Sequence, residues 1–194
     1  KRTRPVASGR LSARWAGGAA LAWLAAGIAL GWLSDRPGTL RIFSLYVAQN
    51  AVYSFGAKHV PLVDAFLLST GFVLRVVLGC VLVGVAPSNW LLLCSSALAL
   101  LLALGKRRGE LLQAPGESQR RALDGYNRSY LDQAMAIVAG ITLFSYALYS
   151  VEAPLLVHGR EFASLPFVVF GVLEYLRLAQ VREGDFANLV GIAL

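Results

Sequence analysis

The sequence predicts an all-α membrane protein, a polytopic bundle of about six transmembrane helices. Hydrophobic residues make up 57% of the 194 residues and charged residues only 15%, and the mean hydropathy is +0.60. A soluble core of this size could not use that much apolar surface. Since lipid offers no water to peptide groups, each apolar stretch is expected to form a helix. The absence of alternating apolar and polar residues argues against a membrane barrel.

Six largely uncharged segments have roughly the length that crosses the hydrocarbon core of a bilayer. They are bounded by charged residues, Pro or Gly, and cover residues 15–33, 40–55, 63–85, 90–105, 134–151 and 162–178. We treat 1–194 as a single transmembrane domain. It is expected to be incomplete at both ends, because the chain opens without Met in a basic segment and closes in an apolar run, 188–194, that is too short to cross.

The basic residues test the number of segments, because six crossings assign every loop to one of two sides. Of the 18 basic residues, Arg36, Arg41 and Arg160 fall on one side and Arg75 and Arg177 fall within segments. By the positive-inside rule the more basic side is cytoplasmic. That side holds the other thirteen, which are Lys1, Arg2, Arg4, Arg10, Arg14, Lys58, Lys106, Arg107, Arg108, Arg120, Arg121, Arg128 and Arg182.

The net charge of +7 indicates a membrane surface or an anionic substrate as the partner. The basic residues sit in short clusters rather than on one continuous face, so no nucleic-acid partner is expected. Two clusters, in 1–9 and 105–111, are denser than positive-inside bias requires, and Lys58-His59 adds a third. Cations that converge at a membrane face can hold phosphate. The bias alone accounts equally well for residues such as Arg120 and Arg128.

Two charged residues lie in the third segment. Asp64 and Arg75 are eleven residues apart, or about three helical turns, so their side chains share a face. We expect Arg75 to line a functional cavity, with a structural contact to a neighbouring helix as the alternative. Three readings of Asp64 stay open: a metal ligand, a partner for Lys58, or a charge favoured by the helix dipole.

Other residues are predicted to have local roles. Glu174 and Arg177, three residues apart, are expected to form a local ion pair. Cys80 and Cys94 lie in apolar runs and are interpreted as packing residues. No P-loop, no His and Cys set at metal spacing and no serine elbow occurs in the sequence, so nucleotide hydrolysis, zinc chemistry and acyl transfer lack support.

Several stretches, in order along nearly the whole chain, resemble the UbiA-type intramembrane prenyltransferases. The opening Lys1-Arg2-Thr3-Arg4-Pro5 is similar to the basic segment that follows the first Asp-rich motif of that family. Stretches 53–59, 71–75, 105–111 and 130–133 are similar to the branch that transfers phosphoribose to decaprenyl phosphate.

The resemblance implies transfer of 5-phosphoribose from phosphoribosyl pyrophosphate to a polyprenyl phosphate, with Mg²⁺, for cell-wall arabinan precursors. It implies a multi-pass protein of a bacterial plasma membrane whose active site faces the cytoplasm. By the same resemblance Arg75 and Glu110 are assigned to catalysis, and Asp64 and Glu110 to the metal. The residues assigned to phosphate and pyrophosphate are Lys1, Arg2, Arg4, Lys58, His59, Lys106 and Arg107.

Two departures from the family pattern bear on these roles. The Asp-rich motif that would bind the essential Mg²⁺ is expected just before Lys1, so the chain by itself is expected to be inactive. Gly109 stands where a larger polar or aromatic residue is expected. Two other functions remain open: transfer of a polyprenyl chain from its diphosphate to an aromatic acceptor, and a non-catalytic membrane transport or assembly subunit. Polyprenyl length and oligomeric state are left open.

Overall fold

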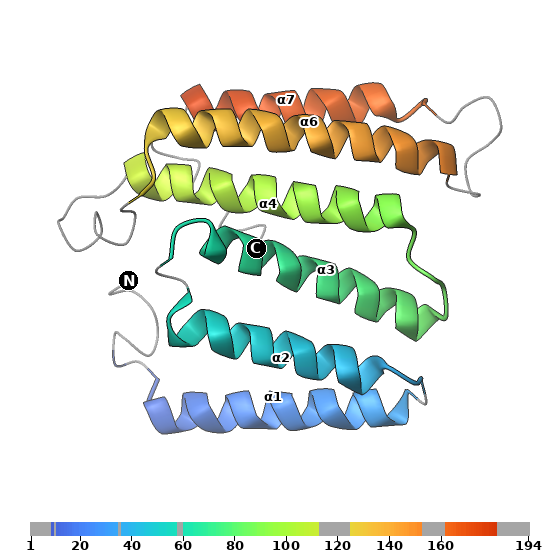
Figure 1. Ribbon diagram of the computed structural model, residues 1–194. Coiled ribbons are helices and arrows are strands. Elements are labelled where there is room, and N and C mark those ends of the chain that lie inside the picture. Colours follow the sequence, from blue (N-terminus) through green and yellow to red (C-terminus); the bar gives the residue numbers. More distant parts are fainter. Residues whose placement is uncertain are drawn as a thin grey trace.

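Six long helices run back and forth between two ends of the molecule in a computed structural model (Figure 1). The structure describes Gly9 and residues 11–34, 36–57, 60–112, 125–152 and 162–181. The helices are α1 (Ala13–Leu33), α2 (Thr39–Phe55), α3 (Val63–Val83), α4 (Asn89–Leu112), α6 (Arg128–Glu152) and α7 (Leu165–Val181). The expected all-α fold is confirmed.

Four of these helices are long and apolar enough to cross a membrane, namely α1, α3, α4 and α6. The other two, α2 and α7, have 17 residues each. The chain is therefore a multi-pass membrane protein, and a crossing by all six helices stays a prediction.

Two helices continue beyond the predicted apolar segments. The fourth segment ends at residue 105 by hydropathy, but α4 continues to Leu112. The fifth starts at 134 by hydropathy, but α6 starts at Arg128. Hydropathy marks where the apolar stretch ends, whereas a helix can continue into a polar region when its charged side chains find partners.

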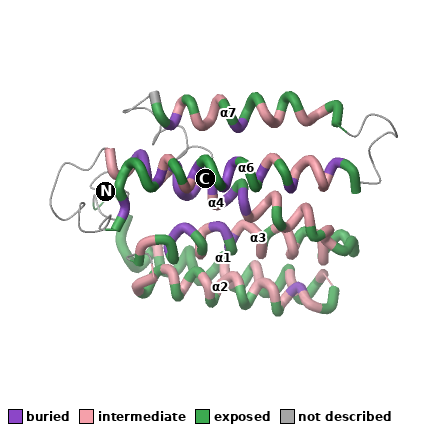
Figure 2. The backbone as a smooth tube through the Cα atoms, turned by 45° about the horizontal axis from the view of Figure 1, so that its top comes forward, coloured by how far each residue is buried: buried purple, intermediate pink, exposed green. Residues whose placement is uncertain are grey.

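The helices form an open row, with α1 at one edge and α7 at the opposite edge (Figure 1). Each packs against its neighbour in sequence, and α4 also contacts α7. No residue of α1 is buried. The buried residues concentrate on α4 and α6, as the purple segments of Figure 2 show.

Small residues let α4 approach its neighbours closely. Ala97, Ala99, Ala103 and Gly105 are all buried on this helix. Lipid tails are as apolar as the side chains that face them, so no hydrophobic force drives helices together in a membrane. Helix packing there relies on close contact between small residues. A Cβ at Gly105 would collide with the hydroxyl of Tyr175 on α7 and lie 3.0 Å from its Cζ.

We predict that Gly105→Ala lowers the free energy of unfolding by about 1 to 3 kcal/mol, because the new methyl group overpacks the α4–α7 contact. Adding Tyr175→Phe should recover part of the loss by removing the colliding oxygen. Thermal unfolding in detergent measures both.

The matched control is Gly140→Ala on α6, where a Cβ would meet no atom within 4 Å. This control should be neutral or slightly stabilising, since Ala favours helix over Gly. Equal melting temperatures for the Gly105 and Gly140 variants would contradict the packing argument.

Candidate active site at the basic end of the bundle

Arg107 on α4 joins the polar groups at the end of the bundle where α1 begins and α4 ends. Its Nε pairs with Oδ2 of Asp64, in the first turn of α3, and its Nη1 pairs with Oε2 of Glu110. Its Nη2 donates to the hydroxyl of Tyr53 on α2 at 3.5 Å. The Asp64 side chain is only 4% exposed. Arg107 therefore links α2, α3 and α4 at this end of the bundle.

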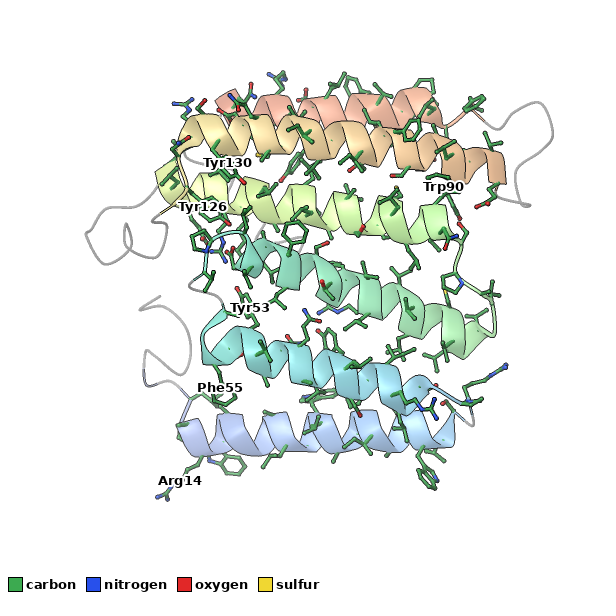
Figure 3. The ribbon with its side chains drawn as sticks, viewed as in Figure 1. Arg14, Tyr53, Phe55, Trp90, Tyr126 and Tyr130 are labelled. Carbon is green, nitrogen blue, oxygen red and sulfur yellow. The ribbon has the colours of Figure 1, made fainter. Side chains whose placement is uncertain are left out.

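Tyr126, just before α6, adds a fourth segment to this network. Its hydroxyl donates to Oδ1 of Asp64 at 2.9 Å and accepts from the backbone N–H of Leu62 at 2.5 Å. Leu62 has a positive φ of 65°, which is rare for a bulky residue and persists only where surrounding contacts hold it. Figure 3 shows Tyr53 and Tyr126 at the same end of the bundle, with Trp90 at the other.

Burial and, to a smaller extent, the hydrogen bond to Asp64 raise the pKa of Tyr126 to about 12, although the hydrogen bond from the Leu62 N–H acts in the opposite direction. The phenol therefore stays protonated at neutral pH. It can donate to the carboxylate without interruption, which keeps the start of α3 in place.

The next residue, Arg108, points to the other side of α4. Its guanidinium is 1% exposed, and its Nε donates to Oδ1 of Asp132 on α6 at 2.6 Å. Its Nη1 donates to the carbonyl of Ala179 on α7. Arg108 thus stabilises the packing of α4 against α6 and α7.

Lys106 lines a pocket of about 200 Å³ between α3 and α4. Among the described residues Lys106 has no ion-pair partner, whereas Arg107 and Arg108 both have one. Arg75 lines the same pocket, and the other lining residues are apolar: Leu68, Phe72, Ala99, Leu102 and Ala103. The pocket combines two cations with an apolar wall, which suits an anionic group attached to a hydrocarbon chain.

Arg75 also lines a second pocket, of about 100 Å³, between α2 and α3. Its Nη2 donates to the hydroxyl of Tyr46 at 2.5 Å, and its guanidinium carbon lies 5.2 Å from the ring centres of Tyr46 and Phe72. The two aromatic rings orient the guanidinium by cation–π contact. Arg75 therefore has a place in the α2–α3 contact as well as on the wall of both pockets.

The structure brings the predicted site residues together in two groups. Arg75 and Lys106 share the α3–α4 pocket, and Asp64, Arg107 and Glu110 form one ion-pair network. Arg75 lines both pockets and also makes the contact with Tyr46 on the neighbouring helix that was the alternative, so a functional role for this cavity stays a prediction. The predicted ion pair between Glu174 and Arg177 is confirmed, with contacts of 2.7 and 2.5 Å. Five other predicted residues lie outside the described residues: Lys1, Arg2, Arg4, Lys58 and His59.

Asp64 and Glu110, the carboxylates predicted to bind the metal, are engaged by neighbouring side chains. Both oxygens of Asp64 are engaged, one by Arg107 and one by Tyr126, and Glu110 is paired with Arg107. No group of three His, Cys, Asp or Glu side chains that could hold a metal occurs within the part of the chain that the structure describes. A metal role for Asp64 and Glu110 stays a prediction.

The sequence analysis gave no site role to Tyr46, Gln49 or Asn50. All three line the α2–α3 pocket, and Tyr46 contacts Arg75 in mid-helix rather than at a helix end. The signal that could have found them was two adjacent amides inside an otherwise apolar segment, since polar side chains in lipid normally face a protein interior.

These observations define a class: a multi-pass helical membrane protein with an ion-pair network at its basic end and cations on the walls of pockets between its helices. A family model for the UbiA prenyltransferases matches residues 1–107, a range that includes Asp64, Arg75, Lys106 and Arg107. The chain belongs to the UbiA prenyltransferase family, which confirms the resemblance found from the sequence.

Three curated relatives carry the same name, decaprenyl-phosphate phosphoribosyltransferase. The one from Corynebacterium glutamicum is 36% identical over all of this chain and 60% of its own length. The one from Mycolicibacterium smegmatis is 32% identical over 56% of this chain and 35% of its own length. The one from Mycobacterium tuberculosis is 28% identical over 78% and 51% respectively. The chain thus spans at most 60% of the length of these relatives.

We predict that Tyr126→Phe lowers the free energy of unfolding by about 1 to 2 kcal/mol, because Asp64 and the Leu62 N–H each lose a buried partner. The difference in the free energy of unfolding between this variant and the unsubstituted protein should be constant below about pH 10, the pKa of an unfolded tyrosine. It should shrink as the pH rises through about 12, the folded pKa, because ionisation removes the donated proton.

Thermal unfolding in detergent across this pH range measures the effect. Tyr130→Phe is the control, since Tyr130 is 38% exposed and lies one turn further along the chain. A loss of stability equal for both variants would contradict the role of the Tyr126 hydroxyl.

Proposed function

We propose that the full-length protein transfers 5-phosphoribose from phosphoribosyl pyrophosphate to a polyprenyl phosphate such as decaprenyl phosphate. The observation that carries the proposal is the α3–α4 pocket, where Lys106 and Arg75 share an otherwise apolar wall. The names of the three relatives support it. A lipid phosphate needs this combination, because its head is anionic and its first isoprene units are apolar.

The proposed reaction needs no strong general base. A phosphate oxygen of the lipid attacks C1 of the ribose, the bond from C1 to the pyrophosphate oxygen breaks, and the bonding pair leaves with pyrophosphate. The attacking oxygen is already ionised, so no proton has to be removed. The barrier lies in the positive charge that develops at C1 and the negative charge that leaves, and both are sensitive to nearby fixed charges.

Lys106 and Arg75 are suited to different parts of this task. Lys106 is a mobile point charge without an ion-pair partner among the described residues, so it can meet a phosphate directly. Arg75 is held by Tyr46 and keeps further N–H groups for an anion at the boundary of the two pockets. Arg107 acts as a positioning residue, because Asp64 and Glu110 already neutralise it.

Magnesium dependence is part of the proposal, with metal ligands outside the described residues. Orientation is also part of it: Lys106, Arg107, Arg108 and Arg128 lie at the end of the bundle that the positive-inside rule assigns to the cytoplasm. The proposed setting is a bacterial plasma membrane, and the proposed product serves cell-wall arabinan synthesis.

The test is a transfer assay on the full-length protein with labelled phosphoribosyl pyrophosphate, polyprenyl phosphate and Mg²⁺. Label should move into the lipid fraction. A second assay offers a polyprenyl diphosphate and an aromatic acceptor. Prenyl transfer without phosphoribosyl transfer would replace the proposal with the prenyltransferase alternative, and no transfer in either assay would favour a transport or assembly subunit.

We predict that Lys106→Gln lowers kcat/KM by about tenfold to a hundredfold, because a charge-assisted hydrogen bond to phosphate is lost. The melting temperature should change little, since Lys106 has no ion-pair partner among the described residues. Arg41→Gln, an exposed cation at the opposite end of the bundle, is the control and should leave kcat/KM unchanged. A Lys106→Gln enzyme within twofold of the unsubstituted enzyme would remove Lys106 from the site.

A further inference from the structure

The α2–α3 pocket differs in chemistry from the α3–α4 pocket. Five of its lining side chains carry hydrogen-bonding groups, namely Tyr46, Gln49, Asn50, Tyr53 and Arg75. Its volume of about 100 Å³ is small. A pocket of this size does not suit a prenyl chain, but its hydrogen-bonding side chains suit a compact group with several hydroxyls.

Gln49 presents an unsatisfied acceptor in this region. Its Nε2 donates to the backbone carbonyl of Leu67 on α3. A carbonyl can only accept, so this contact fixes the amide with its nitrogen toward Leu67 and leaves Oε1 as a free acceptor. Oε1 is buried and has no hydrogen-bond partner among the described residues. A buried amide oxygen without a partner costs about 1 to 3 kcal/mol, so a donor from a ligand would be favoured there.

Gly71 on α3 makes room for this amide. A Cβ at Gly71 would lie 3.2 Å from Nε2 and 3.6 Å from Oε1 of Gln49. Any larger residue at 71 would press on the amide. Gly71 and Gln49 both line the pocket, so together they form a small polar niche in the contact between α2 and α3.

Arg75 connects this niche to the lipid side, because it lines both pockets. An anion at Arg75 would therefore lie between the niche at Gln49 and the α3–α4 pocket. The proposed donor has the same order of groups, with a hydroxylated sugar attached to the diphosphate that must leave.

We infer that the α2–α3 pocket binds the pentose hydroxyls of the donor and that Gln49 is the residue that selects a hydroxylated donor over a prenyl donor. This inference rests on the proposed function. A ribose hydroxyl satisfies Oε1 of Gln49, whereas a prenyl chain leaves the amide oxygen unpaired. Sites built to hydrogen-bond a hydroxyl strongly reject analogues that lack it.

The experiment compares donors on the full-length enzyme in detergent or nanodiscs. The donors are phosphoribosyl pyrophosphate and its 2-deoxy and 3-deoxy analogues, and the variant is Gln49→Met, which keeps side-chain length and removes both polar atoms. Gln49→Met should lower kcat/KM for the ribose donor by about tenfold to a hundredfold and leave KM for polyprenyl phosphate unchanged. The unsubstituted enzyme should discriminate against at least one deoxy donor by a similar factor, and Gln49→Met should lose that discrimination.

Gln133→Met on α6 is the matched control, because Gln133 is exposed and lines neither pocket. Gly71→Ala is a second route to the same result, since it displaces the Gln49 amide without removing it. It should raise KM for the ribose donor several-fold, and melting temperatures show whether either variant is merely unfolded.

Discrimination against deoxy donors that is unchanged in Gln49→Met would overturn the inference while the proposed function stands. A loss of kcat/KM for the ribose donor that is matched by an equal rise in KM for polyprenyl phosphate would also overturn it, because it would indicate a general structural effect. Failure of the proposed function itself has a different signature, because the unsubstituted enzyme would then transfer no phosphoribose at all.

Discussion

The contact between Arg107 and Asp64 determines the geometry of the basic end of this bundle. A charged side chain placed against lipid and protein is costly unless an opposite charge neutralises it, and Asp64 is almost completely buried. The pair therefore holds the end of α4 against the start of α3. Tyr126 binds the remaining oxygen of Asp64 and brings in the segment before α6, so three parts of the chain meet at one carboxylate.

The same constraint explains how three consecutive cations acquire three roles. Successive residues on a helix are about 100° apart, so Lys106, Arg107 and Arg108 cannot face the same neighbour. Once Arg107 faces Asp64 and Arg108 is buried against α6 and α7, Lys106 lies on the wall of the α3–α4 pocket. The paired arginines hold the helices together, and Lys106 is the cation of this cluster without an ion-pair partner in the part of the chain that the structure describes.

The polar residues of α2 show a second consequence of burial in lipid. Tyr46 is hydrogen-bonded to Arg75, and Gln49 is hydrogen-bonded to the Leu67 carbonyl on α3. These contacts satisfy polar groups that lipid could not. Both contacts lie beside the α2–α3 pocket, and Arg75 lines both this pocket and the α3–α4 pocket. In the proposed function this shared cation would lie between the lipid phosphate and the sugar diphosphate.

Composition and charge spacing were sufficient for the all-α membrane fold, the alternation of helices and the basic end, because hydrophobic length and positive-inside bias are properties of local sequence. The family resemblance of the basic stretches also followed from the sequence, as did the expectation that Arg75 faces a cavity. The tertiary structure decided which of the described cations form ion pairs. The sequence alone does not distinguish the roles of Lys106, Arg107 and Arg108. It left three interpretations of Asp64 open, and none of them paired Asp64 with Arg107. The Asp64–Arg107 and Arg108–Asp132 pairings join residues 43 and 24 positions apart, and the free energy of a buried charge depends on which side chain packing brings within reach.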